Sequence, residues 1–333
     1  MSAVETDPKG SSVDRRALAS LFVRVGAFAA LAGILLYFAV YARGFTSPFN
    51  LQNVVEQSAI LTMLAYGMTF VFIGTGTDIQ KGGVDLSVAA NAGLCGAVLV
   101  TVLNMGYSEV VAIPVTLLTG MAMGFLNSLA VVNFRIMPLL ATLAVMNIAA
   151  GLELTITENS VVGAQSELLS AMQFGRFWGI SILAWILIIF TAIVAILAHF
   201  TPFGVRLYAV GGFPEAARAA GLNVGYYVYF SYMFSGLCAG IASIMIVSRL
   251  SAASLGTGLL LLPVLAAALL GTVFSRRFVP TVGGTLIAAL FIGFLANGFQ
   301  LLSISSFWVS GVQGALILLV VALTSFAKPA EGS

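Results

Sequence analysis

Long apolar segments separated by short polar connections run through the whole chain. Ten such segments can be marked, at residues 20–41, 51–73, 86–103, 110–132, 137–157, 179–200, 228–247, 258–274, 282–302 and 307–326. Most are close to the ~20 apolar residues with which an α-helix crosses the hydrocarbon core of a bilayer. The pattern predicts an all-α polytopic membrane protein with about ten transmembrane segments, within a range of about 8–10. The segments 86–103 and 258–274 are shorter, so we expect them to be tilted, broken or only partly membrane-crossing.

The composition agrees with this prediction. Hydrophobic residues make up 60% of the 333 residues and charged residues only 8%, whereas a soluble domain carries about 25% charged residues. We expect a transmembrane domain at residues 20–327, a disordered cytoplasmic tail at 1–19 and a short cytoplasmic tail at 328–333. The net charge of +2 gives no reason to expect binding to nucleic acid.

The basic residues favour one orientation in the membrane. If the N-terminus is cytoplasmic and the connections alternate sides, eleven of the 14 Lys and Arg residues lie inside, and only Arg43, Arg176 and Arg249 lie outside. Cytoplasmic connections normally hold the excess of basic residues. Both termini and the long connection at residues 203–223 are therefore predicted to be cytoplasmic. On the outside, residues 166–173 are predicted to form a short surface helix whose apolar side chains, including Leu169, face the bilayer.

The long cytoplasmic connection is predicted to contain a short, self-capped helix. Pro214 can open a helix because the first turn does not need its N–H. Glu215 places negative charge at the positive N-terminal end, and Ala216 and Ala217 are strong helix formers. Gly221 can end the helix, because glycine adopts the left-handed conformation that often follows a helix. An exposed helix of this kind has the form of a docking element, although an ordinary interhelical loop would explain the composition equally well.

Four motifs in this chain resemble one family of transport proteins. The spacing E-A-A-x-x-x-G from Glu215 to Gly221 resembles the coupling loop of ABC-importer permeases, and the wider run 208–218 followed by 221–224 is similar to ribose-type sugar permeases. The runs 66–71 (YGMTFV), 82–88 (GGVDLSV) and 291–298 (FIGFLANG) agree with the same family and occur in its order. The chain thus resembles ribose-type (monosaccharide) ABC-importer permeases, of the binding-protein-dependent transport inner-membrane component family, from about residue 50 to residue 323.

The resemblance implies a transport subunit, not an enzyme, in the bacterial cell (inner) membrane. It implies ATP-binding cassette subunits on the cytoplasmic side, a second permease subunit (the same or a paralogous chain) and an extracytoplasmic substrate-binding protein that delivers a sugar. The residues that would contact the ATPase subunit are Pro214, Glu215, Ala216, Ala217, Arg218 and Gly221. Arg276 and Arg277, in the next cytoplasmic turn, are a possible second contact.

The chain shows no chemistry of its own for driving transport. It contains no G-x-x-x-x-G-K-[ST] sequence, so ATP would be bound by a partner subunit, and no cofactor is expected in this chain. The single His and the two cysteines, Cys95 and Cys238, offer no arrangement for catalysis or metal binding.

Polar residues near and inside the spans are the remaining candidates. Asp85 and Ser87 precede an apolar segment, and either side chain is predicted to cap the helix that starts there. Uncharged polar and aromatic side chains inside the spans could line a path for a hydroxylated solute; those selected are Asn127, Asn147, Asn297, Gln300 and Phe294. Each polar one could equally make an interhelical hydrogen bond. Gln313 is a further amide within a span.

Several alternatives stay open at this point. The solute could be a nucleoside or a polyol, and an ion-coupled secondary transporter is the rival mechanism, although charged residues are scarce inside the spans. The pairs Gly120/Gly124 and Gly236/Gly240 have a spacing that suits packing within one chain or between two. The acidic residue that ribose-type permeases carry near residues 251–263 is replaced here by the leucines of 259–262, which weakens any transfer of substrate identity.

Overall fold

The computed structural model describes residues 25–26, 28–29, 31–76, 83–275, 279–305, 308–315 and 317–318. The tails predicted at 1–19 and 328–333, and the basic pair Arg276 and Arg277, lie outside this part of the chain.

The described residues form mainly helices. After a helix at Leu31–Tyr41, the elements are α2 (Pro48–Thr75), α3 (Val88–Asn104), α4 (Glu109–Ser128) with the π-helical turn η1 (Leu129–Asn133), α5 (Pro138–Ile156), β1 (Val162–Gly163), α6 (Glu167–Phe174), β2 (Arg176–Phe177), β3 (Ile180–Ser181), α7 (Ile182–His199), α8 (Pro202–Gly212), α9 (Pro214–Ala219), α10 (Val224–Leu250), β4 (Ala252–Ala253), the 3₁₀ turn η2 (Thr257–Leu260), α11 (Leu261–Val273) and α12 (Val282–Leu301). A further helical segment covers 308–315.

Among the described residues, six helices are long and apolar enough to span a membrane, namely α2, α4 with η1, α5, α7, α10 and α12. Three shorter apolar helices cover Leu31–Tyr41, Val88–Asn104 and Thr257–Val273. The prediction of a multi-pass helical membrane protein is confirmed. The total of ten spans and the cytoplasmic position of the termini stay predictions.

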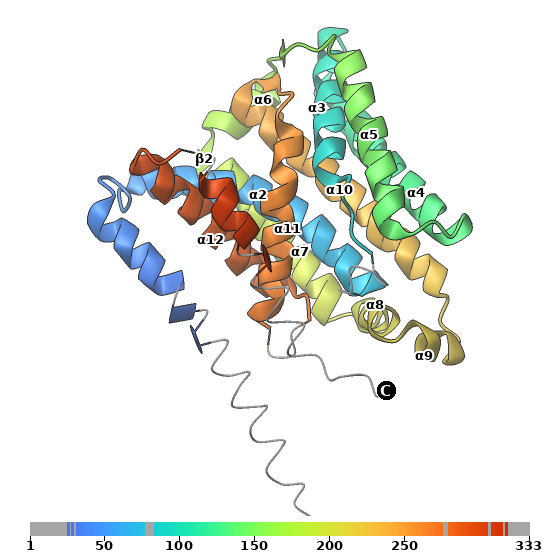
Figure 1. Cartoon of the computed structure of the whole chain (residues 1–333). Helices are drawn as coiled ribbons and strands as arrows, with labels where there is room; N and C mark the ends of the chain where they lie inside the picture. Colours follow the sequence, from blue (N-terminus) through green and yellow to red (C-terminus); the bar gives the residue numbers. More distant parts are fainter. Residues whose placement is uncertain are drawn as a thin grey trace, which may run out of the picture.

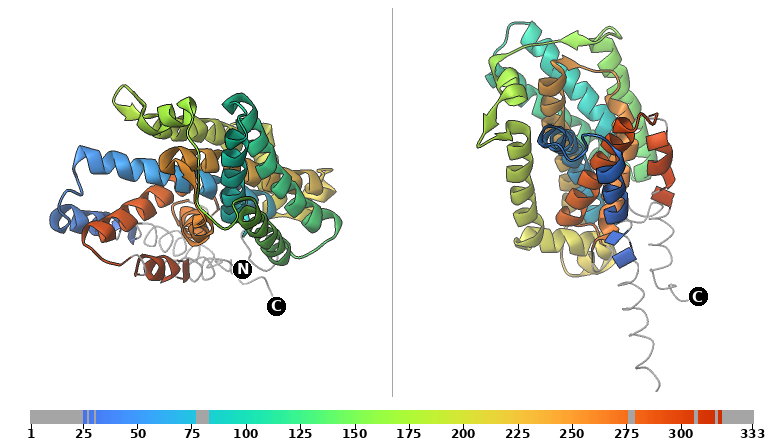
Figure 2. Two further views of the ribbon diagram at one scale, coloured as in Figure 1. Left: turned by 90° about the horizontal axis from the view of Figure 1, so that it is seen from above. Right: turned by 90° about the vertical axis from the view of Figure 1, so that its left-hand side faces the viewer.

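Helix α2 lies at the centre of the bundle, where α10 crosses it (Figures 1 and 2). Of its most apolar stretch, 94% is buried inside the protein, whereas the corresponding value for α5 and for α7 is 28%. A helix that is apolar on every side is suited to such a position, because neighbours cover all of its faces. The exposed apolar faces of α5 and α7 are those expected of helices in contact with lipid or with another subunit.

Glycines allow α4 and α10 to cross at very short range. A Cβ atom on Gly120 would overlap the carbonyl oxygen of Gly236, one on Gly236 would overlap the carbonyl oxygen of Gly120, and one on Gly124 would overlap that of Tyr232. Small residues permit this backbone-to-backbone contact between membrane helices. The two glycine pairs therefore serve packing within one chain, which resolves the alternative that the sequence left open.

The two ends of the bundle differ (Figure 1). At one end, here called the α9 end, α8 lies beside the C-terminal end of α2, and α9 lies beside α8. At the other, the α6 end, β1 pairs with β4, and the Gln173 side chain of α6 donates a hydrogen bond to the Arg249 carbonyl of α10 at 2.9 Å. Strands β2 and β3 form a hairpin whose turn, Trp178–Gly179, has positive φ at both residues, as a tight two-residue turn requires.

Two expectations need correction at the level of elements. Helix α6 exists, capped by the Ser166 hydroxyl, but Leu169 is only 3% exposed and packs in a protein cluster instead of facing a bilayer. The reason is that side chains of α3, α4, α10 and β4 cover Leu169. Helix α8 was not predicted, although its signals are present: the Thr201 hydroxyl accepts the Gly204 N–H at 3.2 Å, and Pro202 occupies the first turn.

Candidate functional site

The predicted short helix of the long connection is present as α9. Pro214 is its first residue, Glu215 lies in its first turn, and Gly221 follows its end with a φ of +83°. The Gly221 N–H bonds the Arg218 carbonyl and the Leu222 N–H bonds the Ala217 carbonyl, both at 3.0 Å. This confirms the local structure that the sequence predicted, because each residue occupies the helical position expected from its chemistry.

Charged side chains of α9 point to solvent, while one alanine attaches the helix to the bundle. The guanidinium of Arg218 pairs with the Glu215 carboxylate at 2.7 Å, and these side chains are 61% and 86% exposed. Such an exposed pair adds little to stability because water screens it. Ala217 is 5% exposed and belongs to the main apolar core. The helix therefore presents a charged, accessible surface from a fixed position.

Helix α8 connects this surface to the centre of the bundle. A Cβ atom on Gly211 would overlap the Ile73 carbonyl oxygen of α2, and one on Gly74 would overlap the Ser231 hydroxyl of α10. The Tyr208 hydroxyl donates to the Pro280 carbonyl at 2.8 Å, just before α12. A displacement of the α8–α9 pair would thus be passed directly to α2, because the two backbones are in contact without intervening side chains.

Asp85 lies at the centre of a buried group of hydrogen bonds that we call the Asp85 cluster. Its Oδ1 accepts the Ser87 N–H at 3.0 Å, the Ser87 hydroxyl at 2.6 Å and the Asn127 amide at 3.3 Å. Its Oδ2 accepts the Ser235 hydroxyl at 2.6 Å. Asp85 is 1% exposed. The carboxylate therefore connects the start of α3 to α4 and α10.

The predicted cap of α3 is not confirmed for either residue, because the Asp85 carboxylate accepts the N–H of Ser87, which precedes the helix, and no N–H of the first turn. Ser87 is the N-cap residue of α3, but its side chain accepts no hydrogen bond from the helix. Its hydroxyl instead donates to Asp85, which itself accepts the Ser87 backbone N–H. Gly83 completes this turn, because a Cβ atom there would lie 2.7 Å from the Tyr232 hydroxyl and 2.5 Å from Oγ1 of Thr75.

The residues selected for a translocation path do not come together. Asn127 belongs to the Asp85 cluster, and Asn297 exchanges two side-chain hydrogen bonds with Asn50, at 2.8 and 2.9 Å. Asn147 is exposed and bonds the Leu143 carbonyl of its own helix, at 2.8 Å.

The other two selected residues lie on α12. Gln300 is exposed at its end, and Phe294 is half-buried with its ring 5.9 Å from that of Phe45. Their role in a path stays a prediction.

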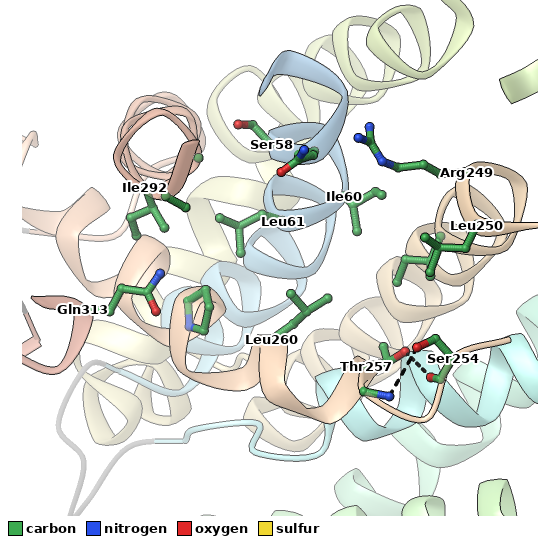
Figure 3. A pocket seen from close by; sticks show the side chains of 16 residues that line it. Ser58, Ile60, Leu61, Arg249, Leu250, Ser254, Thr257, Leu260, Ile292 and Gln313 are labelled. Carbon is green, nitrogen blue, oxygen red and sulfur yellow. Dashed lines mark hydrogen bonds between the residues drawn. The ribbon is translucent and has the colours of Figure 1, made fainter. Parts of the chain in front are cut away.

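A cavity of about 360 Å³ lies between α2, α10, the segment 254–263, α12 and the segment 308–315 (Figure 3). We call it the α2–α12 cavity. Six of its 16 lining residues are polar, namely Gln57, Ser58, Arg249, Ser254, Thr257 and Gln313. Of these six, only Gln313 was predicted as a polar residue within a span. A signal for Ser58 exists in the sequence, because Gln57-Ser58 interrupts an apolar segment.

Charged side chains near the spans are few among the described residues. Arg249 pairs with Glu56 at 3.3 Å and donates to the Asn53 side chain at 2.5 Å, close to the α6 end. Glu153, near the same end of α5, is 6% exposed and packs against Gly93. Within the described residues, no group of three or more His, Cys, Asp or Glu side chains could hold a metal ion.

The model of a family described as "Branched-chain amino acid transport system / permease component" matches residues 50–321.

Comparison with curated proteins gives relatives that align over most of their length. The ribose import permease protein RbsC of Bacillus subtilis (strain 168) is 33% identical over 303 residues, covering 90% of this chain and 92% of that protein. RbsC of Escherichia coli (strain K12) is 34% identical, with 82% and 84% covered. The L-arabinose ABC transporter permease protein AraH of Azospirillum brasilense is 31% identical, with 85% and 82% covered.

Proposed function

Because the chain belongs to the family of branched-chain amino acid transport system permease components, we propose that it is the membrane-spanning permease subunit of an ATP-driven importer of a monosaccharide. The observation that carries this proposal is the alignment with permeases named for ribose and arabinose, which covers at least 82% of both chains in each case. The match of the family model, at residues 50–321, includes the α8–α9 pair and the Asp85 cluster.

The family description names branched-chain amino acids, whereas these relatives are named for sugars. We favour a sugar because the sugar permeases align at 31–34% identity over nearly the whole chain. Uptake by cells that carry the complete transport system tests the choice. We expect ATP-dependent import of ribose or arabinose, and import of leucine without import of either sugar would contradict the assignment.

In the mechanism that we propose, α9 receives force from a cytoplasmic ATPase subunit. The exposed Glu215 and Arg218 side chains supply the contact, and Ala217 and Gly211 attach α9 and α8 to the bundle. Closure of two ATPase subunits would move the α8–α9 pairs of two permease subunits together. Because α8 touches α2 backbone to backbone, the movement would tilt the central helix and change the side on which the path is open.

The same proposal includes the remaining partners. A soluble binding protein would deliver the sugar at the α6 end, and a second permease subunit, the same or a paralogous chain, would complete the path. The complex would lie in a bacterial cell membrane with the α9 end in the cytoplasm, as the distribution of basic residues predicts.

The coupling role is tested by two variants of α9. Glu215→Arg places positive charge at the positive end of the helix and removes the ion pair, and Gly221→Leu forces a side chain into a conformation with φ +83°. We expect both proteins to reach the membrane but to lose import and co-purification of the ATPase subunit.

Glu167→Arg is the matched control, because Glu167 also lies in the first turn of an exposed short helix, at the opposite end of the molecule. It should keep the ATPase subunit bound. Unchanged import in both α9 variants would disprove the role of α9.

A further inference from the structure

An apolar groove of about 350 Å³ lies between α4 and α10, and we call it the α4–α10 groove. It begins near the start of α10, where α8 and α9 lie beside this helix (Figure 1). Met121 of α4 forms one wall, and six side chains of α10 form the rest, namely Tyr226, Tyr229, Phe230, Met233, Phe234 and Leu237. Because every lining side chain is apolar or aromatic, the groove suits a hydrocarbon chain and not a strongly polar solute.

The groove follows the face of α10 that points away from the centre of the bundle. Ser231 and Ser235 lie against glycines of α2, the central helix. The groove residues Tyr229, Met233 and Leu237 are each two positions from one of these serines. Since an α-helix turns by about 100° per residue, they lie on the opposite side of α10.

The length of the groove matches one leaflet of a bilayer. The distance from Tyr226 to Leu237 is about 16 Å at 1.5 Å per residue, and half of the hydrocarbon core is about 15 Å thick. Leu237 is the middle residue of α10, which has the length and composition of a membrane span. The groove therefore runs from the membrane boundary at the α9 end to the bilayer centre, where a soluble protein does not reach.

Helix α8 places an arginine at the boundary end of the groove. The Phe203 ring of α8 lies 6.5 Å from the ring of Tyr226 and 4.5 Å from that of Phe230. Arg206 is exposed and follows Phe203 by three positions, so the two side chains lie on the same side of α8. Its neighbour Val205 is 64% exposed. Basic and apolar side chains exposed together are typical of a helix that lies at a membrane surface.

The turn between η1 and α5 places a second arginine at the same end. The Tyr229 hydroxyl donates to the Asn133 side-chain oxygen at 2.6 Å, which ties this turn to the groove wall. Arg135 follows two residues later and is exposed. It lies between Phe134, which is 69% exposed, and Ile136, which is 41% exposed. This turn therefore also presents one positive charge among apolar side chains.

Neither arginine is neutralised by the protein itself. Within the described part of the chain, carboxylates pair with Arg218 and Arg249, and none pairs with Arg135 or Arg206. Two guanidinium groups are thus available to an anion at the boundary end of an apolar groove. A phospholipid with a net negative headgroup supplies both the anion and the hydrocarbon chain.

We propose that the α4–α10 groove binds an anionic phospholipid of the leaflet at the α9 end. One acyl chain lies along α10, and Arg135 and Arg206 bind the headgroup phosphate. The chain by itself gains little, because the surrounding lipid is as apolar as the groove, so the headgroup decides which lipid is held. Each arginine near a membrane surface strengthens the binding of an anionic lipid roughly fivefold. The proposal goes beyond the proposed function, because it does not depend on the transported solute.

Photocrosslinking in vesicles tests the proposal. The full chain is reconstituted in phosphatidylcholine that contains a trace of a photoreactive lipid with a diazirine in its acyl chain, either phosphatidylglycerol or phosphatidylcholine. Mass spectrometry of the peptides then locates the crosslinks. We expect the phosphatidylglycerol probe to crosslink Met233 and Leu237 at least roughly fivefold more than the phosphatidylcholine probe does.

Variants of the arginines separate the headgroup from the groove. The double variant Arg135→Gln with Arg206→Gln should crosslink almost equally with the two probes. Arg43→Gln is the matched control, because Arg43 is also exposed and pairs with no carboxylate of the described residues, but it precedes α2 at the α6 end. This control should keep the excess of phosphatidylglycerol crosslinks in the groove.

Three results would overturn the proposal. Equal crosslinking of the wild type by both probes, or an excess that the double variant keeps, would disprove recognition of the headgroup. Crosslinks that avoid the groove residues would show that no lipid occupies it. A disulfide between two copies of the Met233→Cys variant would make the groove a contact between permease subunits instead. The proposed function is tested separately by import and would stand in each case.

Discussion

At the scale of single residues, Asp85 shows how one buried side chain joins several helices. Four donors from Ser87, Asn127 and Ser235 point at its carboxylate. For the stability of the fold, the number of donors matters more than the charge of Asp85, because each buried donor left without an acceptor costs about 1–3 kcal/mol.

The effect of replacing Asp85 on stability should therefore depend on whether the new side chain keeps an acceptor oxygen at the same place. We expect Asp85→Ala to lower the thermal midpoint of the purified protein clearly, because the donors lose their acceptor. Asp85→Asn should lie much closer to the wild type, because it keeps one acceptor oxygen and its amide can donate to the Ser235 hydroxyl. Thermal unfolding in detergent measures this difference. A midpoint for Asp85→Ala equal to that of the wild type would show that the cluster does not stabilise the fold.

The sequence predicted only that Asp85 bonds to neighbouring residues. Its position just before an apolar segment led to the prediction of a helix cap, whereas its Oδ1 accepts the N–H of Ser87, the residue before the helix. The bonds to Asn127 and Ser235 cross 42 and 150 residues of sequence. No local pattern indicates such partners, so Asn127 was instead assigned to a possible path.

At the scale of elements, the crossing of α4 and α10 depends on the absence of side chains. The Gly120 and Gly236 backbones lie so close that a methyl group on either would overlap the other helix. Such overpacking typically costs about 1–3 kcal/mol.

Gly120→Ala should consequently destabilise the protein by an amount in that range, measured as a lower thermal midpoint and a lower yield of folded protein. Gly151→Ala is the matched control, since Gly151 lies within α5 and a Cβ atom there would meet nothing within 4 Å. That variant should be neutral or should gain up to about 1 kcal/mol of helix stability. Equal behaviour of the two variants would argue against the close crossing.

Helices α8 and α9 illustrate the limits of prediction for elements. Helix α9 followed from Pro214, Glu215 and Gly221, because start, charge and end signals all fall within a few residues. Helix α8 has equally local signals at Thr201 and Pro202, but at 11 residues it is too short to stand out beside the spans. The local sequence was sufficient to predict both helices, but only α9 was predicted.

At the scale of the whole molecule, the function that we propose assigns the source of energy to a partner ATPase subunit that contacts α9. The chain has no nucleotide-binding loop, and Arg249 near the α6 end is paired with Glu56. Among the described residues, Asp85 and Glu153 are the buried carboxylates that an ion-coupled mechanism could use, and Glu153, packed against Gly93, makes no side-chain bond to a helix partner in the Asp85 cluster.

This leads to a prediction for reconstituted vesicles. The purified chain alone should not accumulate ribose against a gradient, with or without a proton gradient, whereas addition of the ATPase subunit, the binding protein and ATP should produce accumulation. Glu153→Gln should leave that accumulation unchanged, because the coupling that we propose runs through α9. Accumulation by the chain alone, lost in Glu153→Gln, would establish the ion-coupled alternative.

The sequence by itself determined that this is a multi-pass helical membrane protein, that α9 is a short capped helix, and which family it resembles. These properties depend on composition and on neighbouring residues, which a linear reading contains. The tertiary structure alone decided which helix is central, that the glycine pairs pack within one chain, and that Ser58 and Gln313, some 250 positions apart, line one cavity. Such contacts arise from the packing of helices whose apolar surfaces look alike in sequence, so only their arrangement in space distinguishes them.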